Sequence, residues 1–375
     1  SNEVGKIGEG LFRTGFFGAI GSGLVVNSFI KFDDAMRTLR VNLDLFGKSA
    51  QQVDRVMRPL EERIRSLAKT TPFNPTEVAG AAATLAKGGF NPQEILDSLQ
   101  AVLDLARATD SELGSSTTYL INALRTFGIE TKYAGEIASQ FVRGARKGTL
   151  EIEDLATALK YSGSTADNLG VSFQKMIAFF DVLSTRGLAG SIAGTSLNTA
   201  LSQLTKKAEE LAALGDIQLV VGIDKDGNEA LDVLKSLENL FKYADTLPFV
   251  KQQTLFQDVF NLRGARVIPG IRKGLSEINA LTESIANAGD EARVASQIKD
   301  AGAGGAFRQL LSTLQDLNIE LGKTTEQPFI KITAVIKGLL AELGKVATLN
   351  PVLTSLVILS PGILLAAGAG MIALA

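Results

Sequence analysis

The sequence predicts a mainly α-helical protein: an irregular multi-helix assembly with short Gly-marked turns, one small β-hairpin inserted near residues 217–230, and an apolar helical C-terminal segment. Three observations lead to this prediction. Apolar residues recur at steps of three and four, which places them on one face of a helix. Capping patterns precede such stretches, and glycines follow them. No heptad is sustained over several repeats, so we expect no long coiled coil.

The composition excludes several classes of function. The chain has 375 residues, which is enough for two or three domains. Its 38 Lys and Arg residues nearly balance 40 Asp and Glu, whereas a protein that binds nucleic acid generally carries a basic excess. Cys, His and Trp are absent, which excludes disulfides, thiolate metal sites and the Ser-His-Asp triad. We therefore expect no enzyme, with no catalytic, cofactor-binding or metal-binding residues, and no specific nucleic-acid binding.

The chain divides into five predicted segments. Residues 1–31 form an apolar, Gly-rich N-terminal helical segment, and residues 32–215 form a helical core. Residues 216–300 add a small β-hairpin and helices that complete this core. Residues 301–349 form a Gly-rich joint and amphipathic helices, and residues 350–375 form an apolar, potentially membrane-competent segment. Because the chain lacks an initiator Met and ends inside an apolar run, we expect it to be part of a longer protein.

Two helix starts have nearly the same sequence. Phe73-Asn74-Pro75-Thr76-Glu77 and Phe90-Asn91-Pro92-Gln93-Glu94 each contain an Asn that can cap the helix and a Pro at its first position. In each, a Glu can reach back to the cap, and the preceding Phe can pack against the first turn. The first helix should stop at Gly88-Gly89.

Other helix boundaries are predicted in the same way. The helical period over residues 53–67 is interrupted by Pro59, which predicts a kink or a restart. Thr109 and Glu112 match a capping box, and Thr149 opens a further helix. Five glycines are predicted to end helices: Gly128, Gly163, Gly170, Gly187 and Gly215.

The second half begins with a different pattern. Residues 217–223 are short and β-branched, and the turn-forming residues 224–228 follow them, which predicts the hairpin. Ala-Gly-Ala-Gly-Gly at residues 301–305 predicts a joint. After the joint we expect helices over residues 306–322 and 328–348.

Three motifs suggest chemistry, but each has a simpler interpretation. Residues 224–228 resemble a calcium loop, but the sixth-position Gly and the twelfth-position Glu are missing, which favours a hairpin turn. Residues 187–196 resemble a phosphate loop, but they lack its Lys and a preceding strand, which favours a turn or tight helix packing. Arg143, Arg146 and Lys147 precede Gly148, where cations complement the C-terminal end of a helix.

The apolar C-terminal segment leaves two alternatives open. Its 24 residues from Val352 to Ala375 carry no charge and are long enough to cross a bilayer. Pro361-Gly362 interrupts them, which is more typical of buried helices or an apolar hairpin. The segment is therefore a membrane-competent element, or it packs in a core or between copies of the chain. The apolar, Gly-rich residues 14–30 raise the same question.

Several stretches, in their order and spacing, resemble the core region of phage tail tape measure proteins. The matching stretches are Ser66–Ala79, Leu85–Ile95, Ala101–Ala106, Ala123–Gly128, Asp154–Lys160, Ser162-Gly163 with Ala166, Leu169–Ser172 and Leu183–Leu197. The last of them is the most specific. The resemblance extends over roughly residues 32–271.

The resemblance implies a structural component of the virion. Such a protein sits in the tail lumen or tail tip, helps to set tail length and assembly, and leaves the tail during DNA ejection. The implied partners are tail tube proteins, tail-tip or baseplate hub proteins and tail assembly chaperones. Because an apolar segment on the tail axis must be covered by other copies, we expect a cyclic homo-oligomer, with three copies favoured over six. The alternative function is a membrane-inserting, channel-forming protein that delivers phage DNA across the host envelope, with the host membrane as a partner after ejection.

Overall fold

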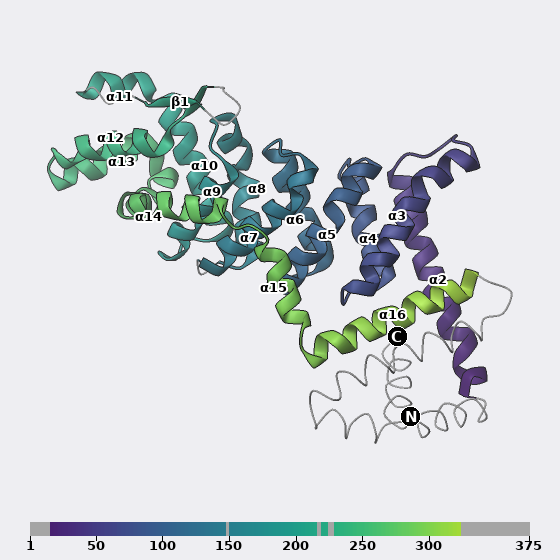
Figure 1. The fold of residues 1–375 in the computed structure, drawn as a ribbon. Coiled ribbons are helices and arrows are strands. Elements are labelled where there is room, and N and C mark those ends of the chain that lie inside the picture. Colours follow the sequence, from purple (N-terminus) through teal and green to yellow (C-terminus); the bar gives the residue numbers. More distant parts are fainter. Residues whose placement is uncertain (1–15, 148–149, 216–218, 224–228, 324–375) are drawn as a thin grey trace. The chain divides into compact units, whose positions relative to one another are not determined.

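The computed structural model describes residues 16–147, 150–215, 219–223 and 229–323 (Figure 1). Helices account for most of these residues, which confirms the predicted mainly α-helical fold class. None of the helices in these ranges is long and apolar enough to cross a membrane. The predicted helix over residues 328–348 and the apolar segment 350–375 lie outside the described residues.

The elements follow one another with short connections. The first half contains α2 (Phe16–Asn42), α3 (Ala50–Thr70), α4 (Pro75–Lys87), α5 (Pro92–Thr109), α6 (Leu113–Thr126), η1 (Thr131–Tyr133), α7 (Ala134–Lys147) and α8 (Ile152–Asn168). The second half contains α9 (Phe173–Ser184), α10 (Gly190–Lys206), α11 (Ala208–Gly215), β1 (Val221–Ile223), β2 (Glu229–Leu231), α12 (Val233–Asp245), α13 (Phe249–Gly264), α14 (Ile268–Ala286), α15 (Glu291–Asp300) and α16 (Ala303–Lys323).

The chain groups into two compact units. The larger unit comprises residues 35–67 and 77–299. Among the described residues, the smaller unit comprises 16–34, 68–76 and 300–323. The five predicted segments are a different division of the chain, and they stay a prediction.

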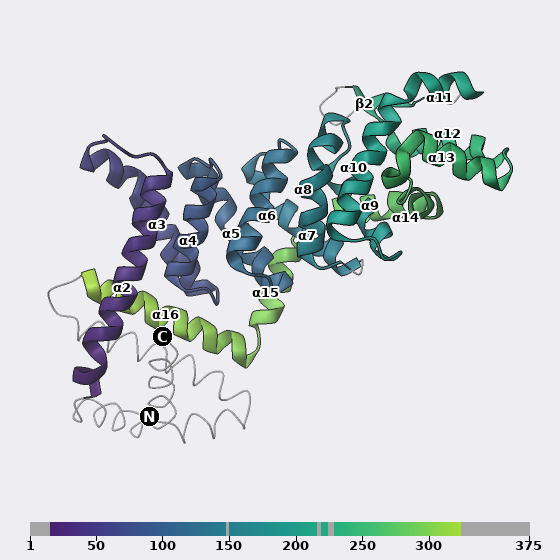
Figure 2. The ribbon, with the colours of Figure 1, turned by 180° about the vertical axis from the view of Figure 1, so that it is seen from behind.

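The larger unit is built from two helical layers. Helices α5, α6, α8 and α10 form a row in which each packs against the next (Figure 2). Helices α7 and α9 form the second layer, α14 packs on α9, and α13 packs on α10.

The core of this unit lies around α9. Every residue from Met176 to Ser184 is buried. The ring of Phe173 meets Phe141 edge to face at 5.0 Å and Phe127 at 5.4 Å between centroids, and such pairs add about 0.5–1.5 kcal/mol each beyond their burial. The helix is therefore enclosed by its neighbours along most of its length.

The two similar helix starts are confirmed as separate helices beginning at Pro75 and Pro92. At the second, the Asn91 side chain accepts hydrogen bonds from the backbone of Gln93 and Glu94, and the Glu94 carboxylate accepts one from the Asn91 backbone. Phe90 is buried below the guanidinium of Arg125, 4.4 Å from the ring centre. Gly89 has a φ of 81°, as expected for the residue that ends the preceding helix.

Three boundary predictions are wrong or incomplete. Thr109 does not cap α6, because it is the last residue of α5 and its hydroxyl donates to the Leu105 carbonyl. Asp110 then ends α5 in the left-handed conformation. Helix α6 begins after Glu112, whose side chain makes no capping hydrogen bond. Gly163 lies inside α8, where an added Cβ would come within 3.0 Å of the Thr126 methyl group, so its role is close packing. Helix α3 runs through Pro59 without a restart, which leaves the kink as the open alternative of that prediction.

The β-hairpin prediction is confirmed by two paired strands. β1 and β2 are antiparallel, with Val221 opposite Leu231 and Ile223 opposite Glu229. The backbone N–H of Leu231 donates to the Leu169 carbonyl, which ties the strands to the end of α8. The connecting residues 224–228 lie outside the described residues.

The smaller unit contains the predicted Gly-rich joint. Helix α15 ends at Asp300 and α16 begins at Ala303. A side chain on Gly305 would overlap the Asp300 carbonyl. The chain can therefore follow this path from α15 into α16 only with glycine at position 305. In the same unit, the Ser312 hydroxyl bridges the carbonyls of Ala68 and Phe73 at 2.6 and 2.8 Å.

Candidate functional site

The segment that resembles a phosphate loop begins helix α10. Gly187 and Gly190 have φ values of 76° and 52°, so both serve turns. Gly194 lies against α8, where an added Cβ would come within 2.5 Å of the Ala158 carbonyl oxygen. The glycines are thus explained by a turn and by close helix packing, the simpler of the two sequence interpretations.

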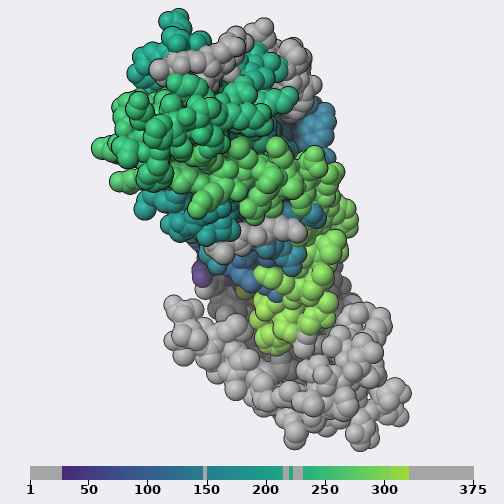
Figure 3. Space-filling model, turned by 90° about the vertical axis from the view of Figure 1, so that its left-hand side faces the viewer, coloured from purple at the N-terminus to yellow at the C-terminus, as the bar shows by residue number. Residues whose placement is uncertain are grey.

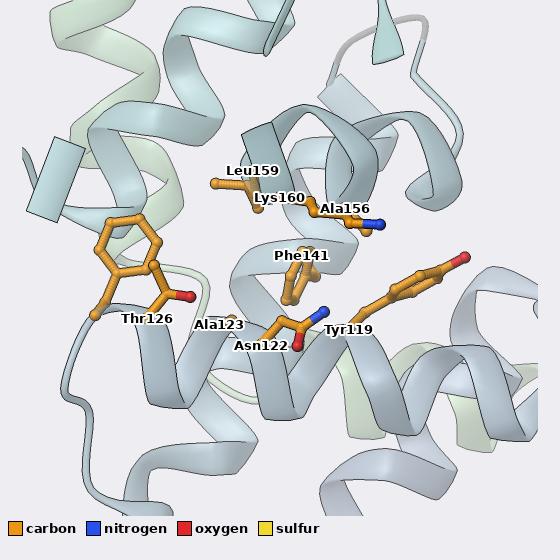
Figure 4. A pocket seen from close by; sticks show the side chains of 9 residues that line it. Tyr119, Asn122, Ala123, Thr126, Phe141, Ala156, Leu159 and Lys160 are labelled. Atoms are coloured by element: carbon orange, nitrogen blue, oxygen red, sulfur yellow. The ribbon is translucent and has the colours of Figure 1, made fainter. Parts of the chain in front are cut away.

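A small hollow lies between α6, α7 and α8 (Figure 4). Phe141, Leu159 and Ala123 give it an apolar lining, and Asn122 and Lys160 supply polar groups. Figure 4 shows the Tyr119 hydroxyl directed away from Phe141. Burial and the charge of Glu153 raise the pKa of Tyr119, so the hydroxyl keeps its proton at neutral pH. The hollow therefore offers no activated nucleophile.

A wider groove lies among α11, α12 and α13, next to the residue that follows α10. Leu247, Leu255 and Val259 line it together with charged residues of both signs. Two of these, Lys207 and Glu210, pair with each other at 2.6 Å. This pair neutralises two of the charges in the groove.

A buried acid and a charged cluster join α15 to the helical layers. The Glu291 carboxylate binds Arg143 at 2.5 Å and Arg146 at 3.1 Å. Asp104 of α5 is buried, and its carboxylate accepts a hydrogen bond from the Ser296 hydroxyl at 2.9 Å. Burial raises the pKa of Asp104, an effect that the Ser296 hydrogen bond opposes. These contacts hold α15 in place.

Sequence reasoning missed Glu291 and the buried pair of Asp104 and Ser296. The two arginines were explained as complementing the end of α7, and they do stand in its last turns. Their specific partner lies about 145 residues further along the chain, so no local pattern could have indicated it. A buried Asp also has no signal in a single sequence, because its burial depends on helices that follow it.

One further acid, Asp181 of α9, has both carboxylate oxygens buried without a hydrogen-bond partner. Burial, reinforced by the negative charge of Glu277, raises the pKa of Asp181 to about 8. In the described part of the chain, no group of three acidic, His or Cys residues is placed to hold a metal ion.

Comparison with known proteins agrees with the resemblance found in the sequence. The chain is 24% identical over 326 residues to the tape measure protein of Pneumococcus phage Dp-1, which covers 86% of this chain and 27% of that protein. It is 24% identical over 286 residues to the probable tape measure protein of Escherichia phage P2, which covers 74% of this chain and 34% of that protein. No solved structure matches the chain.

The chain therefore spans between a quarter and about a third of the length of these relatives. Residues 61–261 match the family described as phage-related minor tail protein. This match covers more than half of the chain, and it includes α4 to α12 and most of α13. These matches confirm the resemblance to phage tail tape measure proteins, and the chain belongs to the phage-related minor tail protein family.

Proposed function

We propose that this chain is the compact region of a tape measure protein in the virion, that it sits in the tail lumen or tail tip, and that it helps to set tail length and assembly. We further propose that it leaves the tail when the DNA is ejected. The observation that carries the proposal is the match over residues 61–261, supported by two tape measure relatives. The family match supports a structural role, and we propose no enzymatic activity for this chain.

The location can be tested by mass spectrometry of purified virions. Peptides from residues 61–261 should be present in intact particles and depleted from particles that have ejected their DNA. A capsid protein and a tail tube protein measured in the same samples serve as controls. Absence of these peptides from intact virions would refute the proposed location, and equal amounts before and after ejection would refute release.

The packing of the larger unit indicates which part of the protein can measure length. A ruler needs a length that grows with residue number, about 1.5 Å per residue for a straight helix. Here the helices from α5 to α10 turn back on one another in two layers. We therefore place the measuring stretch outside residues 1–375. An in-frame deletion of residues 92–126, which span α5 and α6, should abolish tail assembly, whereas a ruler would give tails shortened by about 50 Å.

We also propose a cyclic homo-oligomer, with three copies favoured over six, that contacts tail tube proteins, tail-tip or baseplate hub proteins and tail assembly chaperones. The support is the uncharged stretch from Val352 to Ala375, which water would penalise by about 25 cal/mol per Å² of exposed apolar surface. Light scattering of the intact chain without detergent should give a defined oligomer. A monomer under these conditions would contradict the proposal.

The same uncharged stretch favours a second function, in which the protein inserts into the host membrane and forms a channel for phage DNA. Leakage of dye from liposomes measures this directly. The full chain should cause leakage, and a chain that ends at residue 351 should not. Equal leakage by both would assign the activity to another part of the chain, and no leakage by either would remove this function.

A further inference from the structure

Asp181 occupies the last turn of α9 in an environment that suits a neutral group better than an ion. Its side chain is 2% exposed, and both carboxylate oxygens lack a hydrogen-bond partner. The preceding turns of α9 are also buried, so the carboxyl group cannot reach water by a change of rotamer alone. An unpaired buried carboxylate costs several kcal/mol, and a protein avoids this cost by keeping the proton on the acid.

Two glycines hold the neighbouring helices close to this turn. Gly144 of α7 lies so close to Ile177 that an added Cβ would overlap its side chain, and the same position is 3.8 Å from Asp181 Oδ1. On the other side, Gly274 of α14 lies against Val182 in the same way. The turn that carries Asp181 is therefore clamped between α7 and α14, and water can solvate the carboxylate only if one of these helices moves.

The charges around Asp181 would also oppose its ionisation. Elements α7, α8, α10 and α14 pack against α9. Among the described residues of these elements, Glu277 of α14 is the charged group that acts on Asp181, and its charge is negative. Arg143 of α7, which precedes Gly144 in sequence, forms an ion pair with Glu291. No positive charge therefore offsets a carboxylate at this position.

Asp104, in the same unit, is a buried acid whose carboxylate has hydrogen-bond donors. It lies under α15, and its carboxylate accepts hydrogen bonds from Ser296 at 2.9 Å and Gln100 at 3.1 Å. Ionisation of Asp104 thus strengthens two existing hydrogen bonds, one of them to α15 itself. Ionisation of Asp181 strengthens none and adds repulsion from Glu277.

We propose that Asp181 is a proton-dependent latch that keeps α14 seated on α9 while its carboxyl group is neutral and releases α14 when the carboxyl group loses its proton. Helix α14 is the element that moves, because it lies at the surface of the larger unit (Figure 3) and carries Glu277. Helix α9 stays in place because it is enclosed by α7, α8 and α10 as well.

The pH range of release follows from the two states of the latch. In the closed state, burial raises the pKa of Asp181 to about 8, whereas in the open state the carboxyl group returns to the ordinary value of 3.8. Between these limits the open state has lost its proton and the closed state has not. The equilibrium constant for opening therefore rises about tenfold per pH unit and levels off near pH 8.

Hydrogen exchange of the full chain between pH 6 and pH 8 tests the latch. After correction for the chemical exchange rate, amides of α14 should become about fiftyfold less protected. At both pH values they should remain less protected than amides of α5, because α5 is exposed only when the whole unit unfolds. Asp181→Asn should remove this dependence, because the amide cannot ionise. Asp167→Asn, an exposed acid at the end of α8, is the matched control and should behave as the wild-type chain does.

Glu277→Gln provides an independent variant that leaves the buried site intact. It removes the repulsion, so protection of α14 at pH 8 should be higher than in the wild-type chain. Protection of α14 that does not change with pH in the wild-type chain would overturn the proposal. Equal protection of α14 and α5 at pH 8 would also overturn it, because the two helices would then open together in one global event. The same dependence in Asp181→Asn would assign the effect to another group.

Discussion

Gly194 should not tolerate even one added carbon atom. An alanine Cβ at this position would lie 2.5 Å from the carbonyl oxygen of Ala158 and 2.8 Å from its Cα. Ordinary van der Waals contact begins near 3.4 Å, and both neighbouring atoms belong to the backbone of α8, which cannot rotate away. Helices α8 and α10 would have to separate by several tenths of an ångström along their whole shared interface.

The expected magnitude is a difference between two opposing effects. Replacing Gly by Ala inside a helix gains about 0.5–1 kcal/mol from the lower entropy of the unfolded chain. Overpacking of a close helix contact costs about 1–3 kcal/mol, and the backbone contact at Gly194 puts it at the upper end. We therefore expect Gly194→Ala to lower the free energy of unfolding by about 1–2 kcal/mol.

Gly80 in α4 is the matched control. It also lies inside a helix, but an added Cβ would meet no atom within 4 Å. Gly80→Ala should raise the free energy of unfolding by about 0.5–1 kcal/mol, because it has the propensity gain without the clash. Urea unfolding followed by circular dichroism measures both variants. Equal stabilisation by the two substitutions would refute the close approach of α8 and α10.

Three further predictions concern other contacts. Asn91→Ala should cost about 1 kcal/mol, since it removes the cap of α5, with urea unfolding as the assay and a neutral result as the contradiction. Asp181→Asn should stabilise the chain at pH 7 by up to about 4 kcal/mol, because the folded wild-type chain keeps a proton that the unfolded chain releases near pH 3.8; the gain should vanish near pH 4 in thermal unfolding. The chain should not bind duplex DNA at physiological salt, and submicromolar, salt-dependent binding by fluorescence anisotropy would contradict this.

The sequence was most informative where structure is local. The capping box at Asn91 involves residues within three positions of one another, so a short pattern contains all of it. Gly128 and Gly170 end helices with positive φ values for a similarly local reason. The hairpin was also predictable, because β-branched residues and turn residues occur together near position 221.

The predictions that failed, and the residues that were missed, depend on contacts between segments that are distant in sequence. Gly163 was predicted to end a helix, but Thr126 and Phe127 of another segment press against it, and that contact cannot be inferred from its neighbours in sequence. Glu291 escaped notice because its importance depends on two arginines that are distant in sequence. Asp181 appears in the sequence as one acid among 40 Asp and Glu residues, and only the packing of α7 and α14 distinguishes it.

The close glycine contacts bear on the proposed role of this region in setting tail length. At Gly194 the backbones of two helices approach until no side chain fits, and at Gly144 and Gly274 the backbone of one helix meets a side chain of the next. These contacts fix the position of each helix along its neighbour. Such an assembly changes shape by detaching whole helices and does not stretch gradually, because small displacements lose contacts along the full interface. A tail that must be measured requires a segment with constant rise per residue, which this packing cannot provide. This packing is consistent with the proposed function, in which the described helices hold a fixed position in the tail and another stretch measures its length.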